Sequence, residues 1–434
     1  MMHMGNINVL MTTMEYDVIK VGGLSAALTS ISQTIKQYVN PKIVIPKSGF
    51  EVPWRKLGEK CYENVKVEIY DHDGVEVYTL SNEILDWKEI YPEPANVKGI
   101  KKINEYGRRL IEVVEEIDFD VVHMHDFFAY KAMEKFKQMK KPILLTIHRL
   151  HREYPNWFLG EKIALEKADF ITVVGKSYYQ EDEWELFKKY KDKTTHVFNG
   201  IDTEFWNPHK AAYANLPRKE RRKLILNRYG LEDGIFYLYV GRFDPVQKGV
   251  DILLKASKVF LDENDDVRMI IVGKGDKKLE KWSKELEKEY PSKLKVINKL
   301  LSKEETRDLY SSADFSLVPS IFEPFGLVQL EAMACECIPI GSKTGGIKDT
   351  VISYDEDKQN ACGFLVEKGN PEALLQAMRQ ALKLYKSNPV LINRMRMNGR
   401  KRCERIFQWD ISCRRYYEIY ERLLGIKEEE EGNK

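Results

Sequence analysis

The segment that decides the fold is FYLYVGRFDPVQKGVDILLKASKVFL, residues 236–261. It opens with a continuous apolar run, which predicts a strand that is covered on both faces. A loop from Gly241 to Gly249 follows, and VDILLKASKVFL then repeats its apolar residues at helical spacing. A buried strand, a short loop and an amphipathic helix are together the building unit of a parallel sheet flanked by helices.

The same order recurs along the whole chain. The chain has 434 residues, too many for one ordinary core, so the two series predict two doubly wound, Rossmann-like α/β domains that face a cleft. Open α/β sheets bind ligands beyond the carboxyl ends of their strands, so the cleft is the expected site. The predicted strands are INVLM, KIVIP, VKVEIY, VEVYTL, DVVHMHD, PILLTIH, DFITVV and THVFNG in the first half, and FYLYVGR, RMIIVGKG, LKVINKL, FSLVPS, IPIGSK and GFLVEK in the second.

The domain boundary is predicted in DTEFWNPHKAAYANLPRKERRK, residues 202–223, which has two prolines and no clear period. We therefore predict a first domain over residues 1–213 and a second over residues 214–408. Residues 426–434 contain a run of glutamates and are predicted to form a charged, flexible tail.

The composition excludes several classes of partner. With 69 basic and 67 acidic residues the net charge is +2, which gives no reason to expect nucleic acid, and RKERRK is interpreted as a solvated helix face. No stretch approaches the roughly 20 apolar residues that span a bilayer, and no signal peptide is visible. We expect a cytoplasmic protein without a membrane partner. The six cysteines form no CxxC pair and are interpreted as structural thiols rather than metal ligands.

The stretch FEPFGLVQLEA, residues 322–332, places Glu323 and Glu331 on either side of a glycine. Pro324 and Gly326 are poor helix formers, so a helix is predicted to begin near Gly326, with Glu323 in the preceding loop. Amides at a helix start favour an anion such as phosphate, whereas carboxylates suit the hydroxyls of a sugar or a ribose. The stretch alone equally fits a helix whose glutamates are dipole and surface charges.

Further loops follow strands in the same way. GRFDPVQKG places Arg242 and Lys248 in one strand-to-helix loop, where two cations neutralise a diphosphate. KVGGL, residues 20–24, adds the charge of Lys20 to two glycine amides, and GSKTGGIKD, residues 341–349, repeats the arrangement. One glycine loop is weak evidence for a phosphate site, but several such loops together favour a phosphorylated ligand. No carboxylate cluster suits Mg²⁺, so no metal is expected.

Histidines end two predicted strands of the first domain. HMHD contains His123, His125 and Asp126, and HRLH begins with His148. Histidines near an aspartate suggest a metallohydrolase, but alternation along a strand turns Asp126 away from the two histidines. We favour a sugar-binding or structural role over a metal site. His148 is expected to hydrogen-bond a sugar hydroxyl or to supply a backbone carbonyl.

Several of these motifs together resemble one known family. KVGGL, HMHD, NGID, GRFDPVQKG and FEPFGLVQLEA followed by TGG, in this order, resemble the glycogen and bacterial starch synthases and, more broadly, the retaining GT-B glycosyltransferases. The resemblance covers residues 6 to about 424. The Glu-x7-Glu stretch with an arginine and a lysine upstream is typical of retaining GT-B enzymes, and KVGGL narrows the resemblance to the synthases.

The resemblance implies a role for each residue of the second domain's loops. Arg242 and Lys248 would bind the donor's diphosphate and the departing nucleotide phosphate. Glu331 would hold the nucleotide ribose, and Glu323 would face the transferred glucose. The predicted phosphate-binding amides are those of Gly326, Leu327, Gly22 and Gly23.

The resemblance also implies roles in the first domain. Asp126 and His148 would contact the donor sugar and line the catalytic cleft. The final helix, residues 409–425, would cross back and complete the first domain. The implied activity is retaining transfer of glucose from ADP-glucose or UDP-glucose to an α-1,4-glucan, with the donor phosphate accepting the acceptor's proton.

Two departures and several alternatives remain at this stage. Glu336 stands where the family often has glycine, and the stretch after His148 is short compared with many synthases, which leaves the acceptor's identity open. The alternatives are a GT-B transferase with a small sugar, a lipid or another glycan as acceptor, and a non-catalytic sensor of sugar nucleotides. A phosphorylase would need a pyridoxal phosphate lysine, whose motif we do not find. A sensor would not need Glu323, Arg242 and Lys248 together.

Overall fold

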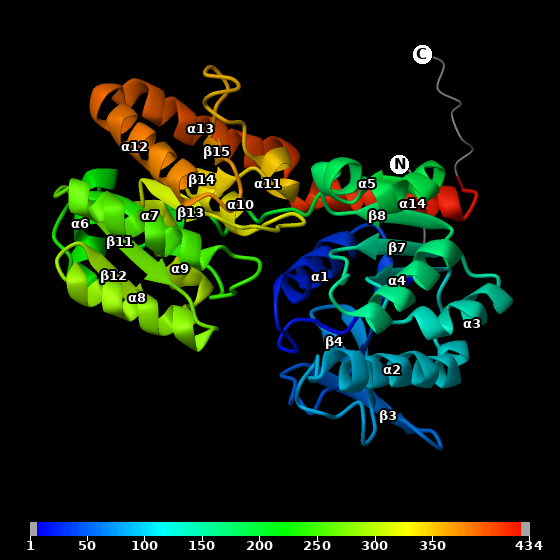
Figure 1. Ribbon diagram of the computed structural model, residues 1–434. Helices are drawn as coiled ribbons and strands as arrows, with labels where there is room; N and C mark the ends of the chain where they lie inside the picture. Colours follow the sequence, from blue (N-terminus) through cyan, green and yellow to red (C-terminus); the bar gives the residue numbers. More distant parts are fainter. Residues whose placement is uncertain (1–6, 427–434) are drawn as a thin grey trace, which may run out of the picture. The chain divides into compact units, whose positions relative to one another are not determined.

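The computed structural model describes residues 7–426, and their contacts divide them into two compact units (Figure 1). The first unit contains the described residues up to Val174, Glu183–Gly200 and the described residues from Trp409 onward. The second unit contains Gly175–Asp182 and Ile201–Gln408. Across residues 7–426, the structure has no helix whose length and apolar character would let it cross a membrane.

The first unit is built on a sheet with the order β3-β4-β5-β2-β1-β6-β7-β8-β9, in which the strands from β5 to β9 along this order run parallel. Its strands are β1 (Asn8–Thr12), β2 (Asn40–Pro46), β3 (Arg55–Cys61), β4 (Lys66–His72), β5 (Val75–Ser81), β6 (Val121–His125), β7 (Ile143–Ile147), β8 (Phe170–Val173) and β9 (Thr194–His196). Its helices are α1 (Gly23–Ile35), α2 (Ile100–Val113), α3 (Met133–Gln138), α4 (Pro155–Lys167), α5 (Trp184–Phe187) and α14 (Trp409–Leu423).

One edge of this sheet is antiparallel, whereas the alternation of strands and helices in the sequence predicts parallel strands. Strands β3, β4 and β5 form an antiparallel meander. Only Asp73 and Gly74 separate β4 from β5, and a parallel crossover needs a dozen or more residues. The edge strand β3 was not predicted because its residues are mostly exposed and charged and form no apolar run. Charged residues of this kind protect a sheet edge from pairing with another chain.

The second unit is built on a fully parallel sheet with the order β12-β11-β10-β13-β14-β15. Both sheets carry helices, so the predicted fold of two Rossmann-like domains is confirmed (Figure 1). The strands are β10 (Ile235–Val240), β11 (Val267–Val272), β12 (Leu294–Ile297), β13 (Phe315–Val318), β14 (Ile338–Ser342) and β15 (Phe364–Val366). The helices are α6 (Arg218–Arg228), α7 (Val250–Glu263), α8 (Lys277–Glu289), α9 (Lys303–Ser312), α10 (Val328–Ala334), α11 (Gly345–Thr350), α12 (Pro371–Ser387) and α13 (Pro389–Ile406).

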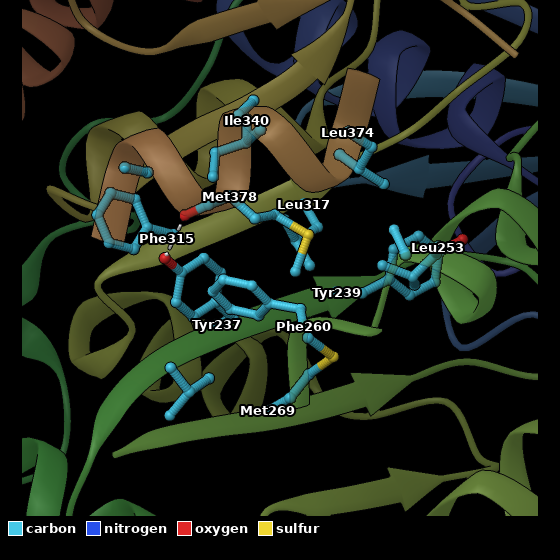
Figure 2. Packing of buried hydrophobic residues seen from close by; sticks show 14 of the residues in the cluster. Tyr237, Tyr239, Leu253, Phe260, Met269, Phe315, Leu317, Ile340, Leu374 and Met378 are labelled. Carbon is cyan, nitrogen blue, oxygen red and sulfur yellow. Dashed lines mark hydrogen bonds between the residues drawn. The ribbon is translucent and has the colours of Figure 1, made fainter. Parts of the chain in front are cut away.

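Aliphatic residues and several aromatic rings fill the core of the second unit (Figure 2). The ring of Tyr237 on β10 lies 4.9 Å from Phe315 on β13 and 5.0 Å from Phe260 on α7. The Tyr237 hydroxyl donates to the carbonyl of Met378 on α12 at 3.1 Å, which satisfies the polar end of a fully buried side chain. The sheet and its helices therefore form one packed scaffold for the loops above β10 and β13.

The contacts place the division of the chain differently from the predicted boundary at residue 213. Trp206 packs on Tyr310, and Arg400 donates to the Trp206 carbonyl at 3.3 Å, so residues from Ile201 onward join the second unit. Residues 175–182 also join the second unit. In the first unit, α14 packs on α1, and the Tyr38 hydroxyl donates to Asp410 at 2.6 Å.

Glu336, the residue at which the chain departs from the family pattern, lies two residues after the end of α10, in the left-handed conformation with φ +61°. Glycine is the residue that adopts this conformation without a steric cost, which explains the family's preference at this position. The predicted charged tail, residues 426–434, lies outside the described residues apart from Ile426.

Candidate active site

The candidate site of the second unit lies on three neighbouring strands. β10 pairs with β13, and β13 pairs with β14, so the loops after these strands emerge at the same edge of the sheet. The chain proceeds from β10 to β11 and β12 on one side and then returns to β13 on the other. β10 and β13 therefore flank the topological switch point, where open α/β sheets bind their ligands.

The loop after β10 is held in one conformation by its own residues. Oδ1 of Asp244 accepts the amides of Val246 and Gln247, both at 2.9 Å. Gly249 has φ +59°, and a Cβ there would lie 2.1 Å from the carbonyl oxygen of Pro319. Only glycine fits this close approach, which brings the loop against the end of β13.

The same approach brings Lys248 and Glu323 together. Nζ of Lys248 lies 2.5 Å from Oε2 of Glu323, and the Ser320 hydroxyl donates to that oxygen at 3.2 Å. The side chains are 21 % and 10 % exposed. A charge-assisted hydrogen bond in such sheltered surroundings fixes both groups in place. The structure thus joins two residues that the sequence separates by 75 positions.

Arg242 lies in the same loop with a freer side chain. Its Nη2 lies 3.4 Å from Oε1 of Gln247 and 3.8 Å from Asp244, and the side chain is half exposed. The backbone carbonyl of Gln247 also accepts the amide of Ile321 at 2.7 Å, which ties this loop to the loop after β13. Two cations therefore lie at the switch point, one paired with a carboxylate and one accessible to solvent.

The amides of Gly326 and Leu327, which the sequence analysis assigns to phosphate, precede α10. Within residues 7–426 neither amide has a hydrogen-bond acceptor. Gly326 has φ +83°, and a Cβ there would lie 2.4 Å from Oε1 of Gln329. The turn into α10 therefore requires glycine and leaves two amides open at the helix start.

The loop before α11 does not match the prediction of free amides. The amide of Gly345 donates to Oδ2 of Asp182 at 2.9 Å, and the amide of Gly346 donates to the carbonyl oxygen of Glu323 at 3.1 Å. Both donors are already satisfied, so the expectation that this loop directs amides at a phosphate was wrong. The loop instead holds the backbone of Glu323.

Glu331 lies in the first turn of α10 with an unengaged carboxyl group. Among the described residues its side chain has no hydrogen bond and no ion pair. The residue is half-buried, yet its carboxyl lies deep enough for burial to raise its pKa from 4.5 to about 7, with Lys303 acting weakly in the opposite direction. A desolvated, unpaired carboxyl group can accept hydrogen bonds from a bound ligand.

In the first unit, the KVGGL loop is organised by a carboxylate that the sequence analysis missed. Oε2 of the buried Glu15 accepts the amides of Val21 at 2.7 Å and Gly22 at 2.9 Å. The amide of Gly22 is therefore not free for a phosphate, which corrects the prediction. In the described part of the chain, the amide of Gly23 and the exposed ammonium of Lys20 have no partner.

Asp126 and His148 meet at the ends of β6 and β7. Oδ1 of Asp126 accepts the His148 amide at 2.7 Å, and Asp126 itself has φ +59°, a conformation that costs energy in any residue with a side chain. Nε2 of His148 lies 3.0 Å from Nδ1 of His125. Burial raises the pKa of Asp126 to about 7 and lowers that of His148 to about 3. His148 is thus neutral at physiological pH.

Deeper in the first unit, His123 belongs to a separate polar network. Its Nδ1 lies 2.7 Å from the Tyr420 hydroxyl on α14, and its Nε2 lies 2.6 Å from the Thr146 hydroxyl. The structure therefore gives His123 a structural role in joining α14 to the sheet. Across residues 7–426, no three histidine, cysteine or acidic side chains are grouped so as to hold a metal ion.

The sequence analysis missed Glu15 and Asp182, and the reason is the same for both. Each carboxylate acts by accepting backbone amides, at positions six and seven residues away for Glu15 and 163 residues away for Asp182. The residue types in a sequence do not show which backbone amides already have a hydrogen-bond acceptor. The only signal was an acidic residue within an apolar stretch, MTTMEYDV, for Glu15.

Comparisons with known proteins find similar glycosyltransferases along most of the chain. Residues 8–197 match the family described as starch synthase catalytic domain, and residues 222–402 match glycosyl transferases group 1. The glycogen synthase of Bacillus cereus is 28 % identical over 96 % of this chain and 100 % of that protein, and that of Finegoldia magna is 28 % identical over 94 % and 97 %. The chain is therefore similar to glycogen and starch synthases over nearly its whole length.

Solved structures of other glycosyltransferases share the fold. The catalytic domain of starch synthase IV from Arabidopsis thaliana, bound to ADP and acarbose, has a TM-score of 0.82 at 20 % identity and covers 97 % of this chain and 100 % of that one. Sucrose-phosphate synthase from Thermosynechococcus elongatus has a TM-score of 0.71 at 20 % identity, with 97 % and 100 % covered. The two Rossmann-like domains are those of the GT-B glycosyltransferases.

Proposed function

We propose that the protein is a retaining glucosyltransferase that extends an α-1,4-glucan from ADP-glucose or UDP-glucose. Glycogen synthases align with the chain over nearly their full length, and a structure of similar fold holds ADP and a sugar. The observation that supports the proposal most is the Lys248–Glu323 pair, because a cation and a carboxylate lie together at the switch point, where open α/β sheets bind their ligands. A cytoplasmic location is part of the proposal.

The donor's phosphates are assigned to the second unit. Arg242 and Lys248 neutralise the diphosphate, and the open amides of Gly326 and Leu327 bind its oxygens. Negative charge grows on the leaving nucleotide as the glycosidic bond breaks, so fixed cations at that position stabilise the transition state more than the ground state. Lys248 is the better placed of the two cations because Glu323 and the loop hold it still.

The donor's hydroxyl groups are assigned to carboxylates. The unpaired carboxyl of Glu331 accepts hydrogen bonds from the ribose, and Glu323 faces the transferred glucose. Asp126 and His148 of the first unit serve the transferred sugar, and Lys20 and the Gly23 amide serve the phosphates. The donor phosphate itself accepts the proton of the attacking hydroxyl, so the reaction needs no separate pair of acid and base carboxyls.

The test is direct. Purified protein is incubated with radiolabelled ADP-glucose or UDP-glucose and glycogen, and the polymer is recovered and digested with an enzyme specific for α-1,4 bonds. We expect label in the polymer that the digestion releases. Label that appears only in a small sugar or a lipid would show that this molecule, and not a glucan, is the acceptor. Hydrolysis of the donor without transfer, or binding of the donor without turnover, would contradict the proposal.

A further inference from the structure

The side chain of His148 is held by a second histidine rather than by a carboxylate. His125 is the last residue of β6, and His148 directly follows β7, the neighbouring strand. Nδ1 of His125 lies 3.0 Å from Nε2 of His148, and both rings are buried. Burial holds the pKa of each ring well below its usual range, so both are neutral. One ring therefore donates the shared proton and the other accepts it.

The other nitrogen of His125 shows which ring is the donor. Nε2 of His125 is fully buried and has no hydrogen-bond partner among the described residues. If His125 accepted from His148, its own proton would lie on Nε2, as a buried N–H without an acceptor. If His125 donates from Nδ1, Nε2 keeps only a lone pair. Buried N–H groups without a partner are rarer in proteins than under-satisfied acceptors, which favours the second arrangement.

We infer that His125 donates from Nδ1 to Nε2 of His148 and thereby fixes His148 in the tautomer that carries its proton on Nδ1. In the part of the chain that the structure describes, Nδ1 of His148 has no partner of its own, but unlike Nε2 of His125 it is not completely shielded, so an N–H at this atom can reach solvent or a ligand. It therefore presents a fixed N–H donor. Given the proposed function, that donor binds an oxygen of the sugar and cannot act as a proton acceptor.

The surroundings keep His125 in this orientation. Its ring lies between His123, with centroids 4.1 Å apart, and His148, with centroids 5.3 Å apart. His123 has both ring nitrogens engaged by Tyr420 and Thr146, so it offers His125 no hydrogen bond. On the far side, Asp126 holds the His148 amide at 2.7 Å. His125 is thus a positioning residue, which orients His148 without touching substrate.

The tautomer is measured without any substrate. Protein labelled with ¹⁵N-histidine is examined at neutral pH by long-range ¹H–¹⁵N correlation spectroscopy, and the His148 signals are assigned from their loss in His148→Gln. We expect the pattern of a neutral ring protonated on Nδ1 for both His148 and His125. A proton on Nε2 of His148, or a charged ring, would overturn the inference. Because no donor or glucan is present, failure of the proposed glucan extension leaves this result unaffected.

Two variants separate the hydrogen bond from the packing. His125→Asn keeps an N–H donor near the Nδ1 position, whereas His125→Leu fills the space without one. We expect His125→Leu to give mixed tautomers of His148 and to lower kcat by about 10- to 100-fold, as loss of such a supporting partner does. His125→Asn should restore the Nδ1 proton and most of the rate. Equal losses in both folded variants, with the tautomer of His148 unchanged, would show that His125 only fills space.

Discussion

Nζ of Lys248 lies 2.5 Å from Oε2 of Glu323, so the cation assigned to the leaving phosphate is paired with the carboxylate assigned to the sugar. Gly249 makes the pairing possible, because it lets the loop after β10 touch Pro319 at the end of β13. In sheltered surroundings, removal of one partner leaves the other charge uncompensated. Variants at either position therefore disturb both halves of the donor.

Lys248→Ala should lower kcat by roughly a hundredfold or more, with a much smaller change in the donor's KM. The reason is that the lysine's charge is most useful as negative charge builds on the departing nucleotide. Steady-state kinetics with saturating glucan measure both constants. A large rise in the donor's KM with kcat unchanged would mean that Lys248 only helps binding.

Arg242→Ala should behave like Lys248→Ala, because the two cations are proposed to act on one diphosphate. The double variant should then lose less than the sum of the single losses in free energy of activation. Arg242→Lys is the matched control, since it keeps the charge but not the forked geometry. Additive losses would show that the two cations act on separate groups.

Glu323→Ala should abolish transfer while the protein remains folded. The carboxylate is proposed to face the glucose, and its loss also leaves Lys248 without its partner. Glu323→Gln tests the charge alone, because the amide retains the shape and a hydrogen-bond acceptor for Ser320. Turnover is compared with the melting temperature of each variant. Near-normal turnover in Glu323→Ala would show that Glu323 is only a charged residue of the loop and has no role at the sugar.

Glu331→Gln should change the pH dependence of donor use. Burial raises the pKa of Glu331 to about 7, and only the ionised form accepts hydrogen bonds from both ribose hydroxyls. The wild-type kcat/KM for the donor should therefore rise as the pH passes through about 7. The glutamine variant should have a lower and flatter profile. Identical profiles in both proteins would exclude Glu331 from donor binding.

Activity should survive EDTA. Arg242 and Lys248 already supply the positive charge that a diphosphate requires, and described residues offer no three-residue acidic or histidine cluster for a metal. The assay is repeated after dialysis against the chelator, with and without added Mg²⁺ or Mn²⁺. Complete loss of activity that either ion restores would contradict the prediction.

Glu161→Gln should make the protein's stability less sensitive to a rise in pH from acidic to neutral values. Oε1 of Glu161 lies 2.7 Å from Nδ1 of His151, and burial raises the pKa of Glu161 from 4.5 to about 8. The folded state therefore binds a proton that the unfolded state releases, so this stability is complete below about pH 4.5 and is lost as the pH rises to about 8.

The melting temperature of wild type should fall more between pH 5 and pH 8.5 than that of Glu161→Gln, because glutamine does not titrate. Both proteins contain Asp126 and Glu331, whose pKa values are also raised, so the difference between the two proteins reports Glu161 together with its contribution to the raised pKa of Asp126. Equal falls in the two proteins would show that Glu161 does not hold its proton in the folded state.

The sequence by itself determined the alternation of strands and helices, the resemblance to glycogen and starch synthases, and the loops that carry the charged residues. Apolar runs and helical spacing report burial directly, and a residue after a buried parallel strand must lie at the sheet's carboxyl edge. That rule is enough to place Arg242, Lys248 and Glu323 at one edge of the second sheet. Their roles in the reaction stay predictions.

The tertiary structure alone decided which backbone amides are open to a ligand. Three glycine loops looked equivalent in the sequence, yet Glu15 accepts the Gly22 amide and Asp182 accepts the Gly345 amide, whereas the amides of Gly326 and Leu327 have no acceptor among residues 7–426. It also decided that His148 pairs with His125 and that β3 forms an exposed edge. Each of these depends on which groups the folded chain brings next to one another, and neither residue type nor periodicity encodes that contact.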